Sequence, residues 1–462
     1  MSEYDVVITG GTVADSAGSA VADLAIRDGR IAAVGRAGSL FDADRRIEAK
    51  GMVVVPGGVD PHVHTATTFG EFSTLDTFAI STSAAAWGGT TTIVDFAIPQ
   101  PAGVVGPLEF AEKRMDMARE AVVDVAFHAC VTRADEQSIQ DIGRLSQRGL
   151  TTVKVFTIYK GVVMLSLDEI YECMRATAAV DGMLLVHAES PQLIEPVREE
   201  LIAKRHTDAY QHAMSRPVES ELSMVRTVIE MLRATGCRGY IVHVSTPEAA
   251  IAIAEARMQG VAVWAETCPH YVFLDDAVYR GENGELYICS PPIRPARTAQ
   301  DLWNVVCAGS IEIWGSDHSC FDIAQKFKYR GDFPRVPNGL PGIELRAPLL
   351  FSEGVAKGRI GLERFVAMTA TNPARLNGLF PRKGSFAIGS DADVAIYDPN
   401  QEVTVDAKDM HMGTDYSPFE GRVVKGWPRT ILSRGRVVVD EMEFLGQPGW
   451  GQVLAAGRPV AP

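Results

Sequence analysis

Short apolar runs separated by turn-forming residues occupy the first fifty positions of the chain. Residues 6–9 are followed by Gly10-Gly11, and residues 23–27 and 30–34 are joined by Asp28-Gly29. An Asp-Gly pair between two apolar runs is a strong signal for a β-hairpin. A β-rich segment of this length is too short to bury a good core alone. We therefore predict a small β unit that packs against another part of the chain.

From about residue 53, strand-like apolar runs alternate with helical stretches. Helical periodicity is clear at 108–119, 166–180, 219–235 and 247–259. Eight β/α alternations over roughly 320 residues favour an α/β fold of the closed (β/α)8, or TIM-barrel, type over an open doubly wound sheet. No Gly-x-Gly-x-x-Gly motif follows the first strand, which weakens a dinucleotide-binding interpretation. The eight strand-like runs are 59–64, 91–96, 122–129, 152–156, 183–187, 240–244, 261–266 and 311–315.

The β-rich, turn-rich character returns in the last fifth of the chain, at 394–397, 430–432 and 437–439. The simplest architecture is one β-sandwich built from both chain ends, with the barrel inserted between them. The segment after the sandwich is rich in Gly and Pro, and we expect it to pack against another subunit. The predicted boundaries are 1–52 and 376–443 for the sandwich, 53–375 for the barrel and 444–462 for the extended tail.

Composition and charge exclude several classes of partner. The 462 residues are 46% hydrophobic and 22% charged, which is typical of a globular protein. A net charge of -14 and a pI near 5.3 argue against nucleic acid or an anionic membrane as the main partner. No apolar run approaches the roughly 20 residues that span a bilayer, and no leader segment is expected. Seven scattered cysteines without a Cys-x-x-Cys pair indicate reduced thiols in a cytoplasmic protein.

Two histidines end the first predicted strand of the barrel. In Val-Asp-Pro-His-Val-His, His62 and His64 are two residues apart and project from the same face of a strand. Two neutral imidazoles side by side suit a borderline-soft divalent metal such as zinc. Taken alone, such a pair is more often part of a half-exposed strand. The rest of a ligand set must therefore come from other strand ends.

Four further polar residues lie on or at the ends of later predicted strands, namely Lys154, His187, His243 and Asp317. The active site of a barrel of this kind lies where its strands end. Each residue has an ordinary explanation alone, such as a hydrogen-bonded core histidine or a helix N-cap aspartate. Coincidence at five strand ends is far less probable. An ammonium among apolar neighbours costs several kcal/mol, whereas a lysine that has taken up carbon dioxide becomes an anionic carbamate that can bridge two metals.

Longer motifs then identify a family. The sequence resembles the amidohydrolase superfamily, and within it the cyclic amidases dihydropyrimidinase and hydantoinase, over nearly its whole length. The segments that carry the resemblance are Pro-Gly-Gly-Val-Asp-Pro-His-Val-His (56–64), Gly-Gly-Thr-Thr-Thr-Ile-Val-Asp-Phe (88–96), Lys-Val-Phe-Thr-Ile-Tyr-Lys-Gly (154–161), Ser-Arg-Pro (215–217), Glu-Thr-Cys-Pro-His-Tyr (266–271), Cys-Ser-Pro-Pro-Ile-Arg (289–294), Pro-Asn-Gly-Leu-Pro-Gly-Ile-Glu (337–344) and Tyr-Ser-Pro-Phe-Glu-Gly (416–421).

The resemblance implies a binuclear zinc site and a homotetramer. One zinc ion would be held by His62, His64 and Asp317, and the other by His187 and His243. Carboxylated Lys154 and a hydroxide would bridge the two ions. The same resemblance implies a small cyclic ureide as the substrate and no nucleic-acid or membrane partner.

The implied reaction is hydrolysis of the ring amide of 5-substituted hydantoins or dihydropyrimidines to N-carbamoyl amino acids. A hydroxide generated between two zinc ions would attack the carbonyl carbon. Asp317 would accept its proton and pass it to the departing ring nitrogen. Tyr159 would help hold the developing oxyanion. Ser290 and Asn338 match positions whose backbone groups grip the ureide edge in relatives, although from the residues alone they are turn residues.

Several other polar residues near strand ends are left out of the predicted site. Asp95, Glu189 and Glu266 have suitable side chains, but the ligand set is complete without them. His318 follows Asp317, and it either hydrogen-bonds to a ligand or has a purely structural role.

One loop departs from the family pattern. Residues 65–70 read Thr-Ala-Thr-Thr-Phe-Gly, where relatives carry bulky apolar residues. Together with 161–164, this loop should cover the substituent at ring position 5. We expect Ala66 and Thr67 to leave space, which favours bulky 5-substituted hydantoins over dihydrouracil.

Two alternatives remain. Allantoinase and dihydroorotase share the barrel and metal site, but their substrates favour a basic pocket, and neither of these loops contains an arginine. A metal-free scaffold protein of the dihydropyrimidinase-like type would have lost ligands, whereas this chain keeps all six.

Overall fold

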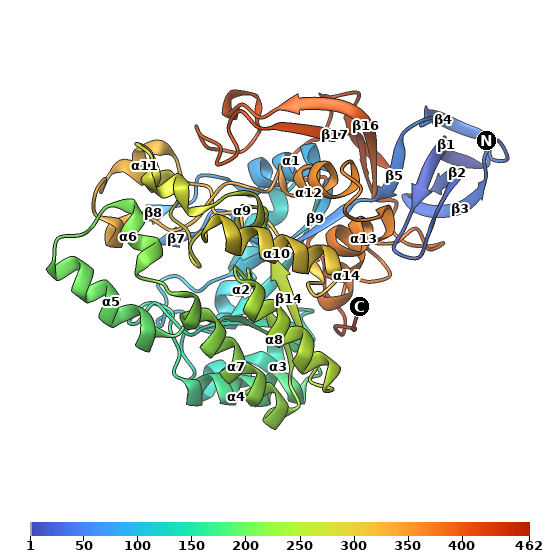
Figure 1. Ribbon diagram of the computed structural model, residues 1–462. Coiled ribbons are helices and arrows are strands. Elements are labelled where there is room, and N and C mark those ends of the chain that lie inside the picture. Colours follow the sequence, from blue (N-terminus) through green and yellow to red (C-terminus); the bar gives the residue numbers. More distant parts are fainter. Residues whose placement is uncertain (1) are drawn as a thin grey trace.

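An eight-stranded parallel sheet forms the centre of the molecule in the computed structural model, which describes residues 2–462 (Figure 1). Its strands follow one another in chain order, so each strand pairs with the next one along the sequence. They are β6 (Gly58–Val63), β9 (Thr90–Ala97), β10 (Asp124–Cys130), β11 (Thr152–Phe156), β12 (Met183–His187), β13 (Arg238–Ile241), β14 (Val263–Thr267) and β15 (Ile313–Trp314).

Backbone hydrogen bonds close this sheet between its last and first strands. The N–H of His318, just beyond β15, donates to the carbonyl of His62 at 3.3 Å, and the N–H of His64 donates to the carbonyl of His318 at 2.8 Å. Val63 and His318 form a parallel bridge. The sheet is therefore a barrel, and the predicted (β/α)8 fold is confirmed.

Helices on the outside of the barrel connect its strands. In α4, Ser166 and Glu169 form a reciprocal capping box at the N-terminus, and Ile170, Cys173 and Met174 are buried at helical spacing. No helix within residues 2–462 is long and apolar enough to cross a membrane. The helices are α1 (Phe78–Trp87), α2 (Pro107–Met117), α3 (Glu136–Gln147), α4 (Leu167–Ala179), α5 (Pro191–Ala203), α6 (Ala209–Met214), α7 (Val218–Thr235), α8 (Pro247–Met258), α9 (Pro269–Phe273), α10 (Ala296–Ala308), α11 (Ile323–Phe327), α12 (Arg346–Leu350), α13 (Leu362–Val366) and α14 (Asn372–Leu376).

A second sheet of nine strands lies beside the barrel and combines both ends of the chain (Figure 1). Its central strand β5 pairs in parallel with β1 and antiparallel with β16. Residue boundaries between this unit and the barrel remain a proposal. The strands are β1 (Tyr4–Ala14), β2 (Ser19–Arg27), β3 (Arg30–Arg36), β4 (Ala43–Glu48), β5 (Val53–Pro56), β16 (Val394–Thr404), β17 (Val423–Ser433), β18 (Arg436–Asp440) and β19 (Glu443–Phe444).

The two glycine signals near the N-terminus have different outcomes. Asp28 and Gly29 have φ values of 50° and 72° and join β2 to β3, so the predicted hairpin is confirmed. Gly10-Gly11 does not end a strand. The register of β1 shifts between Ile8 and Gly11, and Gly10 has a φ of 69°, which is the geometry of a β-bulge within a continuous strand.

The C-terminal tail lies along the barrel of its own chain. The N–H groups of Gly451 and Leu454 donate to the carbonyls of Ala121 and Val125, both at 2.8 Å, and the N–H of Val125 donates to the carbonyl of Gln452 at 2.9 Å. The tail therefore packs against its own chain, and its expected contact with another subunit stays a prediction. An extended segment is held here because it pairs with backbone groups at the start of β10.

Candidate metal centre

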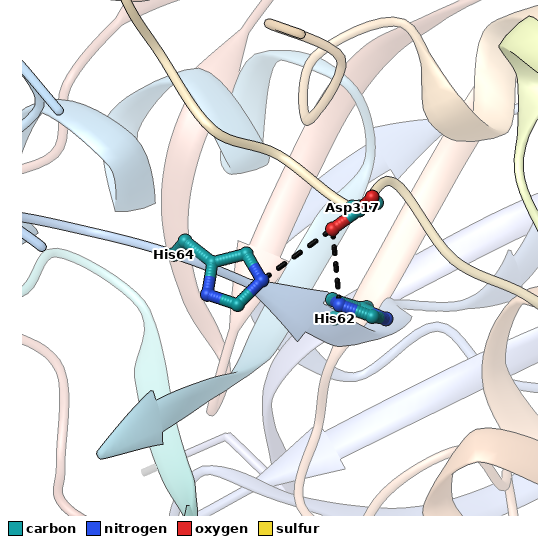
Figure 2. A group of neighbouring side chains, drawn as sticks. All are labelled: His62, His64 and Asp317. Carbon is teal, nitrogen blue, oxygen red and sulfur yellow. Dashed lines mark ion pairs between the residues drawn. The ribbon is translucent and has the colours of Figure 1, made fainter. Parts of the chain in front are cut away.

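Three of the predicted ligands meet where β6 ends. The Nε2 atoms of His62 and His64 lie 3.0 Å and 3.4 Å from Oδ1 of Asp317, as Figure 2 shows. One ligand atom from each of the three residues falls within 4.8 Å of the others. His62 and His64 share a face because they are two residues apart. Asp317 reaches them from the loop after β15, where backbone bonds close the barrel.

The other three predicted ligands lie beside this group. The ring of His243 is 4.5 Å from that of His187 and 5.3 Å from that of His62, centroid to centroid. Nζ of Lys154 lies 5.1 Å from the centre of the Phe96 ring, which also contacts His62 at 4.6 Å and His64 at 5.0 Å. The structure therefore brings the six residues into one cluster, with His62, His64 and Lys154 around the ring of Phe96, which the sequence reasoning did not identify.

Two glutamates that the sequence reasoning set aside hold the histidine rings. Oε1 of Glu266 lies 2.7 Å from Nδ1 of His62 and accepts the N–H of His243 at 3.0 Å. Oε2 of Glu189 lies 2.7 Å from Nε2 of His187 and pairs with Arg216 at 2.7 Å. A carboxylate on the second ring nitrogen is typical of metal-bound histidine, because it fixes the tautomer and orientation of the ring. That rule is the signal that could have found them.

Two further residues near the ligands have structural roles. Nε2 of His318 lies 2.7 Å from Oδ2 of Asp76, and its Nδ1 accepts the N–H of Gly342 at 3.1 Å. Both ring nitrogens are used, so His318 joins loops and its ring holds no ligand. Asp95 pairs with the buried guanidinium of Arg114 and accepts the N–H of Thr65 at 2.8 Å.

Lys154 is the most unusual member of the group, because its side chain is 1% exposed on β11. Burial lowers the pKa of Lys154 to about 8, although Asp317 and Glu266 act in the opposite direction. A substantial fraction of this amine is therefore neutral near physiological pH. Only the neutral form can take up carbon dioxide.

The electrostatics of the cluster fit a divalent cation. Burial lowers the pKa of His64 to about 4 and that of His243 well below its usual range. Burial would raise the pKa of Asp317, but His62 and His64 hold it well below its usual range. Nδ1 of His64 and of His243 are buried with no hydrogen-bond partner in the described chain. Neutral nitrogen donors and a carboxylate are the donor set that zinc prefers.

His62 is the exception, because its pKa is raised. Burial acts to lower the value, but the carboxylates of Glu266 and Asp317 on either side raise the pKa of His62 to about 9. Without a metal, the ring of His62 is therefore protonated at neutral pH, because it lies between two carboxylates. Binding of a cation would displace this proton.

The predicted substrate-binding residues border the cluster. The ring of Tyr159 lies 5.6 Å from that of His187, and Tyr159 has a left-handed backbone with a φ of 70°. Burial raises the pKa of Tyr159 to about 12, while Arg216 and Ser290 act in the opposite direction. Oγ of Ser290 donates to Oδ1 of Asn338 at 2.9 Å. Tyr159 therefore borders His187, and Ser290 and Asn338 form a hydrogen-bonded pair.

The loop after His64 is held by bonds within itself. Thr67 is 2% exposed, its hydroxyl donates to the carbonyl of Thr65 at 3.0 Å, and its N–H donates to Oγ1 of Thr74 at 2.8 Å. The expectation that Ala66 and Thr67 leave space beside the substrate stays a prediction. Phe69 is the exposed aromatic residue of this loop, with its ring 5.9 Å from His64 and 36% of the residue exposed.

Comparison with known proteins agrees with this arrangement. A model of the amidohydrolase family matches residues 53–438, and a model of the urease alpha-subunit N-terminal domain matches residues 1–57. The D-hydantoinase of Geobacillus stearothermophilus is 40% identical over 459 residues, which cover 98% of this chain and 96% of that protein. The D-phenylhydantoinase of Escherichia coli O1:K1 / APEC is 38% identical over 459 residues, 99% of each.

Solved structures give the same picture. The dihydropyrimidinase from Brevibacillus agri NCHU1002 superimposes with a TM-score of 0.95 at 36% identity, covering 99% of each chain. The L-hydantoinase (dihydropyrimidinase) from Arthrobacter aurescens superimposes with a TM-score of 0.91 at 30% identity, covering 98% of this chain and 100% of the other. The family match, the relatives and the structures together show that this chain belongs to the amidohydrolase family.

Proposed function

We propose that the protein is a binuclear zinc hydantoinase that opens the ring amide of 5-substituted hydantoins, and of dihydropyrimidines, to N-carbamoyl amino acids. The observation that carries the proposal is the convergence of four histidines, an aspartate and a buried lysine at one end of the barrel. The relatives named as D-hydantoinase and D-phenylhydantoinase support the same substrate class.

The residues have distinct roles toward the metals. His62, His64 and Asp317 would hold one zinc ion, His187 and His243 the other, and Lys154 as its carbamate would lie between them. When bound, two zinc ions supply Lewis acidity and a water of lowered pKa. Glu266 and Glu189 support this assignment, since each leaves one nitrogen of its histidine ring free for a metal.

The proton transfers fall to Asp317. Its low pKa keeps it ionised and able to accept a proton at neutral pH. The ring nitrogen that leaves the carbonyl carbon needs a proton, and Asp317 would return the one it has accepted. Its carboxylate lies within 3.4 Å of both His62 and His64, so it can act without a large movement.

Tyr159, Ser290 and Asn338 would bind the ureide. A phenol whose pKa is about 12 stays protonated at neutral pH, so Tyr159 can donate a hydrogen bond to the oxyanion that develops at the carbonyl. The backbone groups of Ser290 and Asn338 would bond to the ring N–H and C=O groups, while the bond between their side chains at 2.9 Å holds the two residues together.

The substituent at ring position 5 would lie near Phe69. The Phe69 ring is partly exposed, and it lies 6.3 Å from the buried ring of Phe321. Apolar aromatic surface next to His64 favours an aryl or alkyl substituent over the charged groups of allantoin-like or orotate-like rings.

We also propose a cytoplasmic homotetramer. All seven cysteines are free thiols, and six of them are buried, as expected in a reducing compartment. The tetramer rests on the resemblance to hydantoinases, and light scattering of the purified protein measures it directly.

A substrate panel tests the proposed activity. Zinc-loaded protein should hydrolyse 5-phenylhydantoin faster than hydantoin, dihydrouracil, allantoin or dihydroorotate, and chromatography should identify the N-carbamoyl product. Asp317→Asn is the matched control, because it keeps the size of the side chain and removes the proton acceptor. Turnover of allantoin or dihydroorotate alone, or no turnover of any of the five, would contradict the proposal.

A further inference from the structure

The two residues proposed to grip the ureide lie on separate irregular segments. Ser290 follows the end of a short turn at Ile288, and Asn338 lies in a stretch outside any helix or strand. Neither segment has a regular ladder of backbone hydrogen bonds to set its position. The distance between them must therefore be fixed by individual contacts.

A buried lysine donates hydrogen bonds to both segments. Nζ of Lys326, on α11, donates to the carbonyl of Ile288 at 2.8 Å and to the carbonyl of Pro337 at 2.9 Å. Ile288 also accepts the N–H of Gly339 at 3.0 Å. Lys326 thus bonds to the residue immediately before Asn338 on one segment and to the residue two positions before Ser290 on the other.

Burial of the Lys326 side chain costs free energy, which indicates that this residue has a specific role. Its side chain is 0% exposed, and within residues 2–462 it forms no ion pair with a carboxylate. Most lysines stay in water, because a buried ammonium without a carboxylate partner loses its hydration. Burial lowers the pKa of Lys326 to about 7. A neutral amine has two N–H donors, which match the two carbonyls.

Other side chains already hold the rest of the Ser290 segment. Nε2 of His212 lies 2.7 Å from the carbonyl of Cys289, and the hydroxyl of Tyr271 donates to the carbonyl of Pro291 at 3.0 Å. Loss of Lys326 should therefore leave this segment folded. What Lys326 adds is its connection to the segment that carries Asn338.

We propose that Lys326 is a positioning residue that sets the spacing between Ser290 and Asn338 and thereby the binding of the substrate's ureide edge. This inference rests on the proposed function, and it deepens it by naming what aligns the two binding groups. Lys326 contacts none of the six proposed metal ligands, so its effect should fall on substrate binding and leave the metals in place.

Lys326→Met tests the proposal, because methionine has a similar length and no donor. We expect KM for 5-phenylhydantoin to rise about tenfold or more, with kcat changed much less and the metal content of the wild type retained. Lys357→Met is the control, since Lys357 pairs with Glu353 at 2.7 Å on the surface. Lys326→Gln keeps two donors on a shorter chain and should have an intermediate KM.

Several outcomes would overturn the proposal. An unchanged KM in Lys326→Met would do so, as would a loss of metal that accounts for the whole effect. Failure of both Lys326→Met and Lys326→Gln to fold would assign the residue to the core of the fold. If Lys326→Met raises KM by the same factor in the Asn338→Ala background as in the wild type, the lysine does not act through Asn338.

Hydrogen exchange separates this inference from the proposed function. The N–H of Gly339 should exchange faster in Lys326→Met than in the wild type, because the carbonyl that it bonds has lost its second anchor. This measurement needs no substrate. A wild type without ureide hydrolysis would refute the function alone, and unchanged exchange at Gly339 would refute the role of Lys326.

Discussion

The lowered pKa of Lys154 leads to a quantitative prediction about assembly of the metal site. With a pKa of about 8, roughly one Lys154 amine in ten is neutral at pH 7, against roughly one in three thousand for an ordinary lysine. Burial thus makes the reactive form about 300-fold more abundant, which corresponds to about 3 kcal/mol. Formation of a carbamate on Lys154 should be correspondingly fast at neutral pH.

The assay is reconstitution of the metal-free protein. After chelation and removal of carbon dioxide, zinc is added at pH values from 6 to about 10. One series contains no bicarbonate. In the other, bicarbonate is adjusted at each pH so that the concentration of dissolved carbon dioxide stays constant. Because the pKa is lowered, the rate of reactivation should rise about tenfold per pH unit below pH 7 and level off above about 8. An ordinary lysine would give a rate that rises to above pH 10.

Lys154→Ala supplies the matched control. This variant should lose activity and at least one metal, and short carboxylates such as acetate or propionate should restore part of both. Any pH dependence that remains in the rescued variant belongs to other groups, such as the proton on His62. Equal reactivation of the wild type with and without bicarbonate would refute the carbamate. A rate still rising steeply from pH 8 to 10 would refute the effect of burial.

Three further changes test other parts of the site. Glu266→Gln should weaken zinc binding roughly 10- to 100-fold in a chelator competition, because it removes the carboxylate from His62. The control Glu255→Gln, on the exposed face of α8, should leave zinc affinity unchanged, and equal affinities of the two variants would contradict the prediction. Phe69→Ala should lower kcat/KM for 5-phenylhydantoin by a factor that corresponds to about 1–3 kcal/mol, and should lower kcat/KM for hydantoin less. An equal loss for both substrates would place the substituent elsewhere. Thr67→Leu should lower the melting temperature by several degrees in calorimetry, because it places an apolar side chain where a hydroxyl was bonded within the loop, and an unchanged melting temperature would contradict this.

The barrel and the cluster of candidate ligand residues were predictable because their signals are local. The segments 152–156 and 183–187 are continuous apolar runs, and their predicted bounds are those of β11 and β12. His62 and His64 needed only the two-residue period of a strand. The last strand was less predictable, since it comprises only Ile313–Trp314 and its neighbours belong to loops.

The supporting carboxylates could not be placed in the same way. Glu266 reaches His62 across 204 positions of sequence, from β14 to β6. Which strands face each other across the barrel depends on its closure, and no local pattern encodes that contact. The internal contacts of the loop after His64 could not be predicted for a related reason. Thr68–Phe69 pairs with Phe72–Ser73 in a two-stranded hairpin, and strand pairing sends neighbouring side chains to opposite faces.

Three residues of the site have backbone conformations that local preference opposes. Tyr159, His243 and Asp317 have φ values of 70°, 39° and 50°, a region that costs a residue with a side chain about 1–3 kcal/mol. Each lies just beyond a barrel strand, where the chain turns toward the site.

The surrounding hydrogen bonds explain how these conformations persist. The N–H of His243 donates to the same Glu266 carboxylate that bonds His62, and the carbonyl of Tyr159 accepts three N–H groups from the turn that follows it. Next to Asp317, the N–H of Ser316 donates to Asp60 at 3.1 Å. The bonds to Glu266 and Asp60 join different strands and exist only once those strands have come together. The orientation of His243 and Asp317 is therefore a property of the assembled fold, whereas that of Tyr159 is supported by its own turn.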